Sequence, residues 1–189
     1  MPVDIQNLQH IFRIDKKKIV RFAEAILEAM GEHRAELSLV FVNDLYIKGL
    51  NYKYRNVDFS TDVLAFGCRD EACLVHTNLQ YRKLYPPLFS SLQICWGKSN
   101  RRDGSKTKQG GRRKSSKSCR EAIFLLGDVV ISTQTAKREA KKRKVFVQKE
   151  IELYLTHGIL HLLGYDDENR RDRKKMRAKE RELLLALSA

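Results

Sequence analysis

A predicted apolar helix that carries two histidines constrains this chain more than any other feature. Residues 156 to 168 read THGILHLLGYDDE, at the end of a segment from about 148 to 163 whose pattern predicts a helix. Helical side chains four residues apart lie one turn apart on one face, so His157 and His161 can converge on one ion. Gly164 can end the helix and turn the chain back, because glycine adopts positive φ at little cost. The pattern therefore predicts a helix that carries metal ligands.

The acidic residues after this turn, Asp166, Asp167 and Glu168, can supply at least one carboxylate oxygen. Two imidazoles and a carboxylate, with a fourth position left to water, form a common catalytic zinc site. The alternative is a pair of structural histidines beside a polar helix end. Zinc proteases of the HExxH pattern carry a glutamate base after the first histidine, where this chain has Gly158. The sequence thus argues against a protease of that class.

The composition indicates a single globular domain whose basic surface could bind an anionic partner. The 189 residues include 37 Lys and Arg against 23 Asp and Glu, a net charge of +14, which suits RNA phosphates or an anionic membrane. Nucleic acid is the favoured partner. No apolar run reaches the roughly 18 residues that span a bilayer, and the start lacks a signal-peptide pattern, so we expect a soluble cytoplasmic protein without membrane contact. The four cysteines lack zinc-ribbon spacing, which favours free thiols.

Most of the net excess of positive charge lies in one stretch, residues 98 to 120, which holds ten Lys and Arg and only Asp103 as an acid. Its Ser, Gly and Lys content cannot bury enough apolar surface to offset the entropy of ordering, so we expect a disordered loop. The loop would lie in an insertion spanning about 68 to 123. Two interpretations of this loop remain open: a solvent-exposed segment without a function, or a segment that binds RNA nonspecifically.

The remaining segments predict an α/β (α+β) domain in which helices surround a small mixed sheet. A helix follows Asp15 and ends near Gly31. Asp44 can cap a short helix that runs past Tyr54. Expected strands cover 36 to 44, 60 to 66 and 124 to 132, and expected helices follow Ser132 or Thr133 and cover about 148 to 163 and 169 to 187.

Three segments of the sequence resemble the YbeY family of single-metal endoribonucleases. HGILHLLGYDD is similar to the family pattern H-G-x-x-H-L-x-G-[YF]-D-H. NYKYRNVDFSTDVLAF, residues 51 to 66, and LGDVVIS, residues 126 to 132, are similar to two further family segments in the same order. The resemblance covers the chain except about 68 to 123, where the family has a shorter connection. It implies a zincin-like metal-site helix in one domain of residues 1 to 189.

The resemblance also implies site residues. His157 and His161 fall on two ligands of one zinc ion, and the third ligand, a histidine in the family, falls on Asp167. A carboxylate can replace that imidazole, but it adds negative charge and makes the bound water less readily ionised. Asp166 is the other candidate for this ligand. Arg55 falls on the family arginine near the metal and would be catalytic, by holding or neutralising a scissile phosphate.

The function implied is a single-strand-specific endoribonuclease that matures ribosomal RNA, in late 16S rRNA processing and ribosome quality control. Its partners would be ribosomal RNA and the small ribosomal subunit. Two alternatives remain open: a ribosome-associated RNA-binding protein with a structural or degenerate metal site, and a metal-dependent hydrolase of another substrate. Asp62 and Asp128 match family acids, but each can equally have a structural role.

Overall fold

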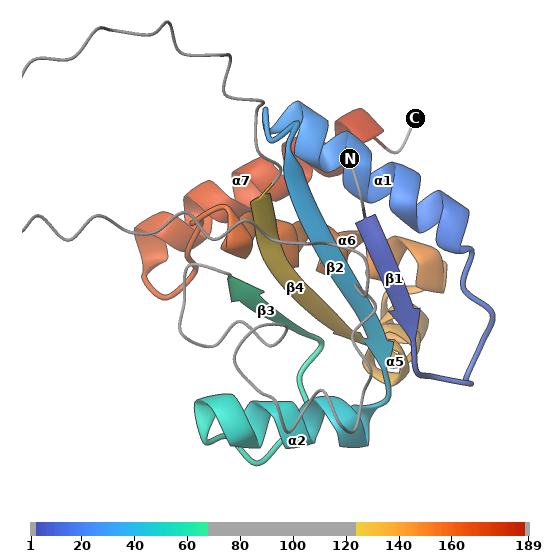
Figure 1. The fold of residues 1–189 in the computed structure, drawn as a ribbon. Coiled ribbons are helices and arrows are strands. Elements are labelled where there is room, and N and C mark those ends of the chain that lie inside the picture. Colours follow the sequence, from blue (N-terminus) through green and yellow to red (C-terminus); the bar gives the residue numbers. More distant parts are fainter. Residues whose placement is uncertain (1–2, 68–123, 188–189) are drawn as a thin grey trace, which may run out of the picture.

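A four-stranded mixed sheet forms the centre of the computed structural model, which describes residues 3 to 67 and 124 to 187 (Figure 1). β2 pairs in parallel with both β1 and β4, whereas β3 pairs antiparallel with β4 and forms an edge. The strands are, in their order across the sheet, β1 (Val3–Asn7), β2 (Ala35–Val42), β4 (Phe124–Ser132) and β3 (Val63–Gly67). This confirms the expected α/β class with a small mixed sheet.

Helices cover both faces of the sheet. α1 and α6 pack against one face, with α7 packed on these two helices, and α2 packs against the other face. The helices are α1 (Lys16–Ala29), α2 (Asp44–Arg55), α5 (Thr133–Arg143), α6 (Val147–Leu162) and α7 (Arg170–Leu187). In the part of the chain that the structure describes, none of these helices has both the length and the apolarity to cross a membrane.

Most helix boundaries follow the local sequence signals. The Asp15 side chain accepts a hydrogen bond from the Lys18 backbone N–H at 3.1 Å and so caps α1, as predicted. The predicted cap of α2 was wrong by one residue. Asn43 is the cap, and its side chain accepts from the Tyr46 N–H at 2.8 Å. Asp44 instead binds groups at the start of α5.

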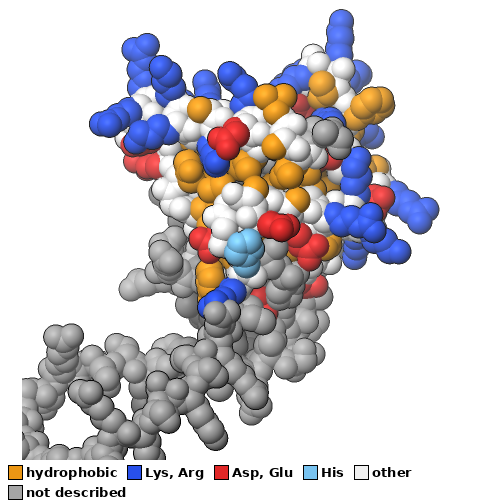
Figure 2. All heavy atoms as spheres, turned by 90° about the horizontal axis from the view of Figure 1, so that it is seen from above, with side chains coloured by type: hydrophobic (Ala, Val, Ile, Leu, Met, Phe, Trp, Pro, Cys, Tyr) orange, Lys and Arg blue, Asp and Glu red, His pale blue; other side chains and the backbone are white. Residues whose placement is uncertain are grey.

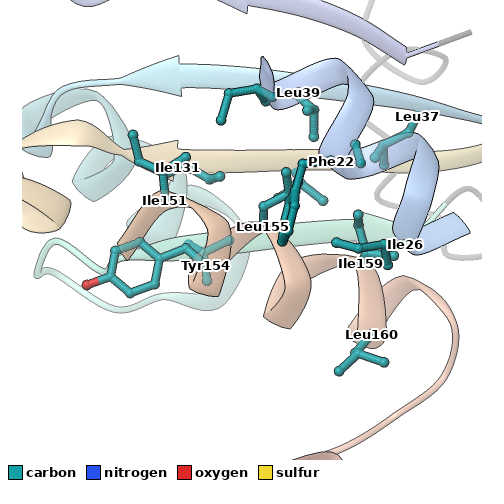
Figure 3. Packing of buried hydrophobic residues seen from close by; sticks show 14 of the residues in the cluster. Phe22, Ile26, Leu37, Leu39, Ile131, Ile151, Tyr154, Leu155, Ile159 and Leu160 are labelled. Atoms are coloured by element: carbon teal, nitrogen blue, oxygen red, sulfur yellow. The ribbon is translucent and has the colours of Figure 1, made fainter. Parts of the chain in front are cut away.

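Burial on both faces explains why β2 and β4 read as nearly continuous apolar runs. Leu37 and Leu39 of β2 and Ile131 of β4 face the α1 and α6 side, whereas Val42 and Val130 face α2. Figure 3 shows Ile151, Leu155 and Ile159 of α6 on the side toward these strands and α1, and Leu160 on the side away from the sheet. The labelled α6 residues are Ile151, Tyr154, Leu155, Ile159 and Leu160. The α6 helix is therefore both a core element and the carrier of the histidines.

The edge strand β1 was not predicted from the sequence, although Val3 and Ile5 alternate with polar residues and both pack against the core. Five residues of alternation are too short to separate a strand from an irregular segment. The insertion expected at about 68 to 123, with its basic stretch 98 to 120, lies outside the described residues.

Candidate metal centre in a cleft beside the β3 edge

The absence of a side chain at Gly158 lets α6 lie close to the sheet. A Cβ atom at this position would lie 2.6 Å from Val129 Cγ1 on β4 and 3.3 Å from Val63 Cγ2 on β3. Real Cβ contacts are not as short as the first of these distances, so any larger residue would force the helix away. This packing excludes the glutamate that a HExxH protease would carry here. It also fixes His157, the preceding residue, at the edge of the sheet.

The C-terminus of α6 turns back through a glycine. Gly164 has φ +88° and its N–H donates to the His161 carbonyl at 3.0 Å, while the Tyr165 N–H donates to the Leu160 carbonyl at 3.0 Å. These two bonds form a Schellman motif, as the sequence predicted from the glycine. The turn brings the Tyr165 carbonyl to 3.0 Å from His161 Nδ1. The helix end thus supplies a hydrogen-bond acceptor to its own histidine.

The second histidine has an acceptor on another helix. His157 Nδ1 lies 3.4 Å from Glu180 Oε1 of α7, and the Glu180 side chain is only 16% exposed. The sequence interpretation missed Glu180. The available signal was its place between Met176 and Leu183, the two buried residues of α7, because an acid on the apolar face of a helix needs a partner. Residues 176, 180 and 183 share one helical face.

The two imidazoles meet through their remaining nitrogens. His157 Nε2 lies 3.2 Å from His161 Nε2, and the ring planes are nearly perpendicular, at 86°. When both Nδ1 atoms carry the proton that they donate, both Nε2 atoms present lone pairs to the same point. Two nitrogens bound to one zinc at about 2.0–2.1 Å in a tetrahedron would lie ~3.3 Å apart. The donor set and its spacing therefore fit a zinc ion.

Asp167 lies beside this pair and Asp166 does not. Asp167 Oδ1 is 4.0 Å from His161 Nε2, and the ligand atoms of His157, His161 and Asp167 all lie within 4.8 Å of one another. Asp166 Oδ1 instead accepts the backbone N–H groups of Asp167 and Glu168, at 2.7 and 3.1 Å. Asp166 therefore stabilises the turn that presents Asp167.

The electrostatic surroundings of the two histidines differ. Burial alone would lower the pKa of His157, but the hydrogen bond and the charge of Glu180 outweigh it and raise that pKa. Burial lowers the pKa of His161, and the neighbouring His157 lowers it further. Of the two imidazoles, His157 therefore keeps a second proton to higher pH, and the lone pairs of two neutral Nε2 atoms that face each other repel. A metal cation would neutralise the same repulsion.

Arg55 lines the same cleft as the metal-ligand candidates. It is the last residue of α2 and its side chain is exposed. The cleft has a volume of about 1140 Å³ and lies along β3, the start of β4 and the C-terminal part of α6. Its polar lining side chains are Glu32, Arg55, Thr61, Asp62, His157, His161 and Asp167. The structure thus brings together all four predicted site residues, although their roles stay predictions.

The two further acids of the sequence analysis have different places. Asp62 lines the cleft, where its Oδ1 accepts from Thr61 Oγ1 at 3.0 Å and from the Val63 N–H at 2.9 Å. These bonds give it a local structural role at the start of β3. Asp128 is buried in β4 and does not line the cleft.

Positive charge is not confined to residues 98 to 120. Seen from above, Lys and Arg side chains project from several sides of the molecule, with hydrophobic side chains gathered between them (Figure 2). Elsewhere, the last turn of α5 carries Lys141, Lys142 and Arg143, and Lys144 follows at its C-cap. A polyanion could therefore contact the described surface at more than one place.

Comparison with known proteins places this site in a family. The family model described as Endoribonuclease YbeY matches residues 4–188. A relative from Pelotomaculum thermopropionicum, named Endoribonuclease YbeY, is 36% identical over 188 residues that cover 97% of this chain and 95% of the relative. A relative of the same name from Aquifex aeolicus is 31% identical over 177 residues, covering 93% and 86%.

A solved structure supports the fold. The solution structure of a Thermotoga maritima protein aligns with a TM-score of 0.52 at 18% identity, covering 98% of this chain and 88% of that one. At this identity the likeness concerns the fold alone. The family match spans nearly the whole chain, and these two relatives are similar over most of their own length. The chain therefore belongs to the YbeY endoribonuclease family.

Proposed function

We propose that this protein is a zinc-dependent, single-strand-specific endoribonuclease that acts on ribosomal RNA during its maturation. The observation that carries the proposal is the facing pair of imidazole nitrogens, 3.2 Å apart, in one cleft with Asp167 and Arg55. The match to an endoribonuclease family supports RNA as the substrate. The processing of 16S rRNA and contact with the small ribosomal subunit are part of the proposal and rest on the family resemblance.

His157, His161 and Asp167 would hold the metal. When bound, a zinc ion supplies Lewis acidity and an ionised water at neutral pH. Asp167 brings a negative charge where the family pattern has a histidine, which lowers the Lewis acidity of the site. The chain's own residues orient this site: the Tyr165 carbonyl accepts from His161 Nδ1, and the Glu180 carboxylate lies 3.4 Å from His157 Nδ1.

Arg55 would bind the scissile phosphate. Its guanidinium can donate two parallel hydrogen bonds to phosphate oxygens and offset charge that develops on them. Its place at the end of α2 leaves the side chain exposed at the cleft, where a single strand can reach it. A base-paired segment is stiffer and holds its phosphates on the outside of a wide helix, so the proposal favours unpaired substrate.

The decisive experiment measures zinc content and cleavage of single-stranded RNA together, for wild type and His161→Ala. We expect about one zinc per chain and cleavage in the wild type, with both lost in the variant. Zinc without cleavage would favour an RNA-binding protein with a structural metal site. Peptide hydrolysis that disappears with the metal would favour a hydrolase of another substrate.

A further inference from the structure

The α7 helix places the Glu180 carboxylate beside His157 of the candidate metal centre. Met176 and Leu183 of α7 are 1% and 3% exposed and pack into the core shared with α6. Glu180 follows Met176 by four residues and precedes Leu183 by three, so it lies on the same helical face. The two buried neighbours hold this face toward α6. The Glu180 carboxylate is thereby kept beside His157, with its side chain 16% exposed.

The contact selects one tautomer of His157. A neutral imidazole carries its proton on one nitrogen and offers a lone pair on the other. Glu180 Oε1 lies 3.4 Å from Nδ1, and an ionised carboxylate can only accept, so the proton belongs on Nδ1. Nε2 then keeps its lone pair, and Nε2 is the nitrogen that faces His161 at 3.2 Å. Loss of the carboxylate would remove this preference.

We propose that Glu180 is a positioning residue of the metal centre, which fixes the tautomer and the ring orientation of His157. The inference deepens the proposed function and rests on its metal site. His161 receives the equivalent support from the Tyr165 carbonyl on its own helix end. The centre therefore depends on α7 as well as α6, and truncation of α7 would impair it without removing a ligand. Outer-shell partners of this kind typically contribute 10–100-fold in metal affinity.

Two substitutions separate the positioning role from simple packing. Glu180→Gln keeps the size of the side chain and one acceptor oxygen but removes the charge, whereas Glu180→Ala removes the acceptor as well. We expect zinc affinity, measured by competition with a chromogenic chelator, to fall by roughly 10–100-fold in Glu180→Ala and by less in Glu180→Gln. Glu182→Gln is the matched control, because Glu182 is 64% exposed and pairs with Lys179.

A spectroscopic readout tests the tautomer without metal or activity. Nitrogen-15 NMR of the metal-free protein, at a pH where the imidazole is neutral, should show His157 protonated at Nδ1 in the wild type and in Glu182→Gln. The Nε2-protonated form should grow in Glu180→Ala. An unchanged tautomer together with unchanged zinc affinity in Glu180→Ala and Glu180→Gln would overturn the proposal.

The ribonuclease function and the positioning role of Glu180 can be tested separately. A wild-type protein that binds zinc but cleaves no RNA contradicts the proposed function and leaves the tautomer measurement intact. If Glu180→Ala does not fold, Glu180→Gln decides: zinc affinity and tautomer both equal to wild type would overturn the positioning role. A fall in zinc affinity with an unchanged melting temperature of the metal-free protein would support it.

Discussion

Gly158 and Val129 are so close that a single methyl group on the glycine would overlap the valine: the added Cβ would lie 2.6 Å from Val129 Cγ1. Val129 is fully buried and β-branched, so it has little freedom to move away. The contact joins α6 to the sheet next to the first histidine. Changes at this point therefore affect both the stability of the core and the geometry of the site.

Gly158→Ala should destabilise the protein. We expect an overpacking cost of about 1–3 kcal/mol, larger than the gain of up to about 1 kcal/mol from placing alanine in a helix. Zinc affinity should fall as well, because α6 must shift. The control is Gly49→Ala in α2, where an added Cβ meets nothing within 4 Å and stability should rise. Urea unfolding of both variants checks this, and equal stabilisation of the two would contradict the close packing.

The third metal ligand can be assigned by substitution. Asp167→Asn should weaken zinc binding by more than the roughly 10–100-fold typical of outer-shell changes, because it removes the charged oxygen that lies 4.0 Å from His161 Nε2, on the side of the two facing nitrogens. Asp166→Asn should change it much less, since Asp166 serves the turn. Zinc titration of both variants distinguishes them. The reverse order of affinities would make Asp166 the ligand.

Arg55→Ala should reduce RNA cleavage with little effect on zinc content. Removing one donor that stabilises developing charge commonly costs about 100- to 1,000-fold in kcat. Arg55→Lys should recover only part of this loss, because an ammonium cannot bind a phosphate in bidentate fashion. Lys53→Ala removes a cation from the same helix turn at a residue that does not line the cleft. Equal kinetics for Arg55→Ala and Lys53→Ala would rule out a specific role for Arg55.

Asp44 makes the stability of the fold depend on pH in the acidic range. Burial alone would raise the pKa of Asp44, but hydrogen bonds from Ser132, Arg138 and Thr135 lower it below its ordinary value of 3.8. A carboxyl group whose pKa is lowered in the folded state stabilises the fold at pH values above its pKa in the unfolded chain. That stability is lost as the pH falls through the folded pKa. The contribution should therefore be complete near neutral pH, begin to fall near pH 3.8, and be lost only when the pH is below the lowered pKa of the folded state.

Asp44→Asn tests this response. At pH 7 the variant should be less stable by roughly 1.5–3 kcal/mol, the usual contribution of hydrogen bonds to a charged group. The gap in unfolding free energy between wild type and variant should narrow as the pH is lowered below 3.8. Chemical denaturation at several pH values measures it. A gap that does not vary with pH would show that the charge of Asp44 contributes nothing.

The basic end of α5 should bind RNA phosphates. The double variant Lys141→Gln with Lys144→Gln should reduce the slope of log affinity against log salt, by up to about 0.7 for each phosphate of single-stranded RNA that is no longer neutralised. Zinc content and melting temperature should stay at the wild-type values, because both side chains are exposed. Fluorescence anisotropy across a salt series is the measurement. An unchanged slope would exclude this surface from RNA binding.

Local signals in the sequence were enough to predict most of the fold. Three predicted features depend only on residues close together in the sequence, and the structure contains all of them: the Asp15 cap, the Gly164 turn and the apolar strand 124 to 132. The cap of α2 was harder, because Asn43 and Asp44 are both good capping residues. The distinction depends on the start of α5, where Asp44 has its partners.

The site was predictable where its residues are close in sequence and not where they are distant. The approach of His157 and His161 to an acidic residue follows from one helix and one turn, but the choice of Asp167 came from the family resemblance. The presence of Arg55 in the same cleft came from the family resemblance and not from spacing. The place of Glu180 on the apolar face of α7 indicated that it needs a partner, but the identity of that partner depends on how α7 packs against α6, which no local pattern specifies.

The pairing of Gly67 with Gly127 has a consequence for the length of this chain. These residues are partners in the antiparallel β3 and β4 ladder, and β3 ends at Gly67 whereas β4 begins at Phe124, so the end of β3 lies beside the first residues of β4. Closing a flexible connection between two neighbouring strand ends costs about (3/2)RT ln n, and each doubling of its length adds only ~0.6 kcal/mol. Sequence can therefore accumulate or disappear there at little thermodynamic cost. The search for this pairing, however, becomes slower with length, and folding rate is what a long connection changes most.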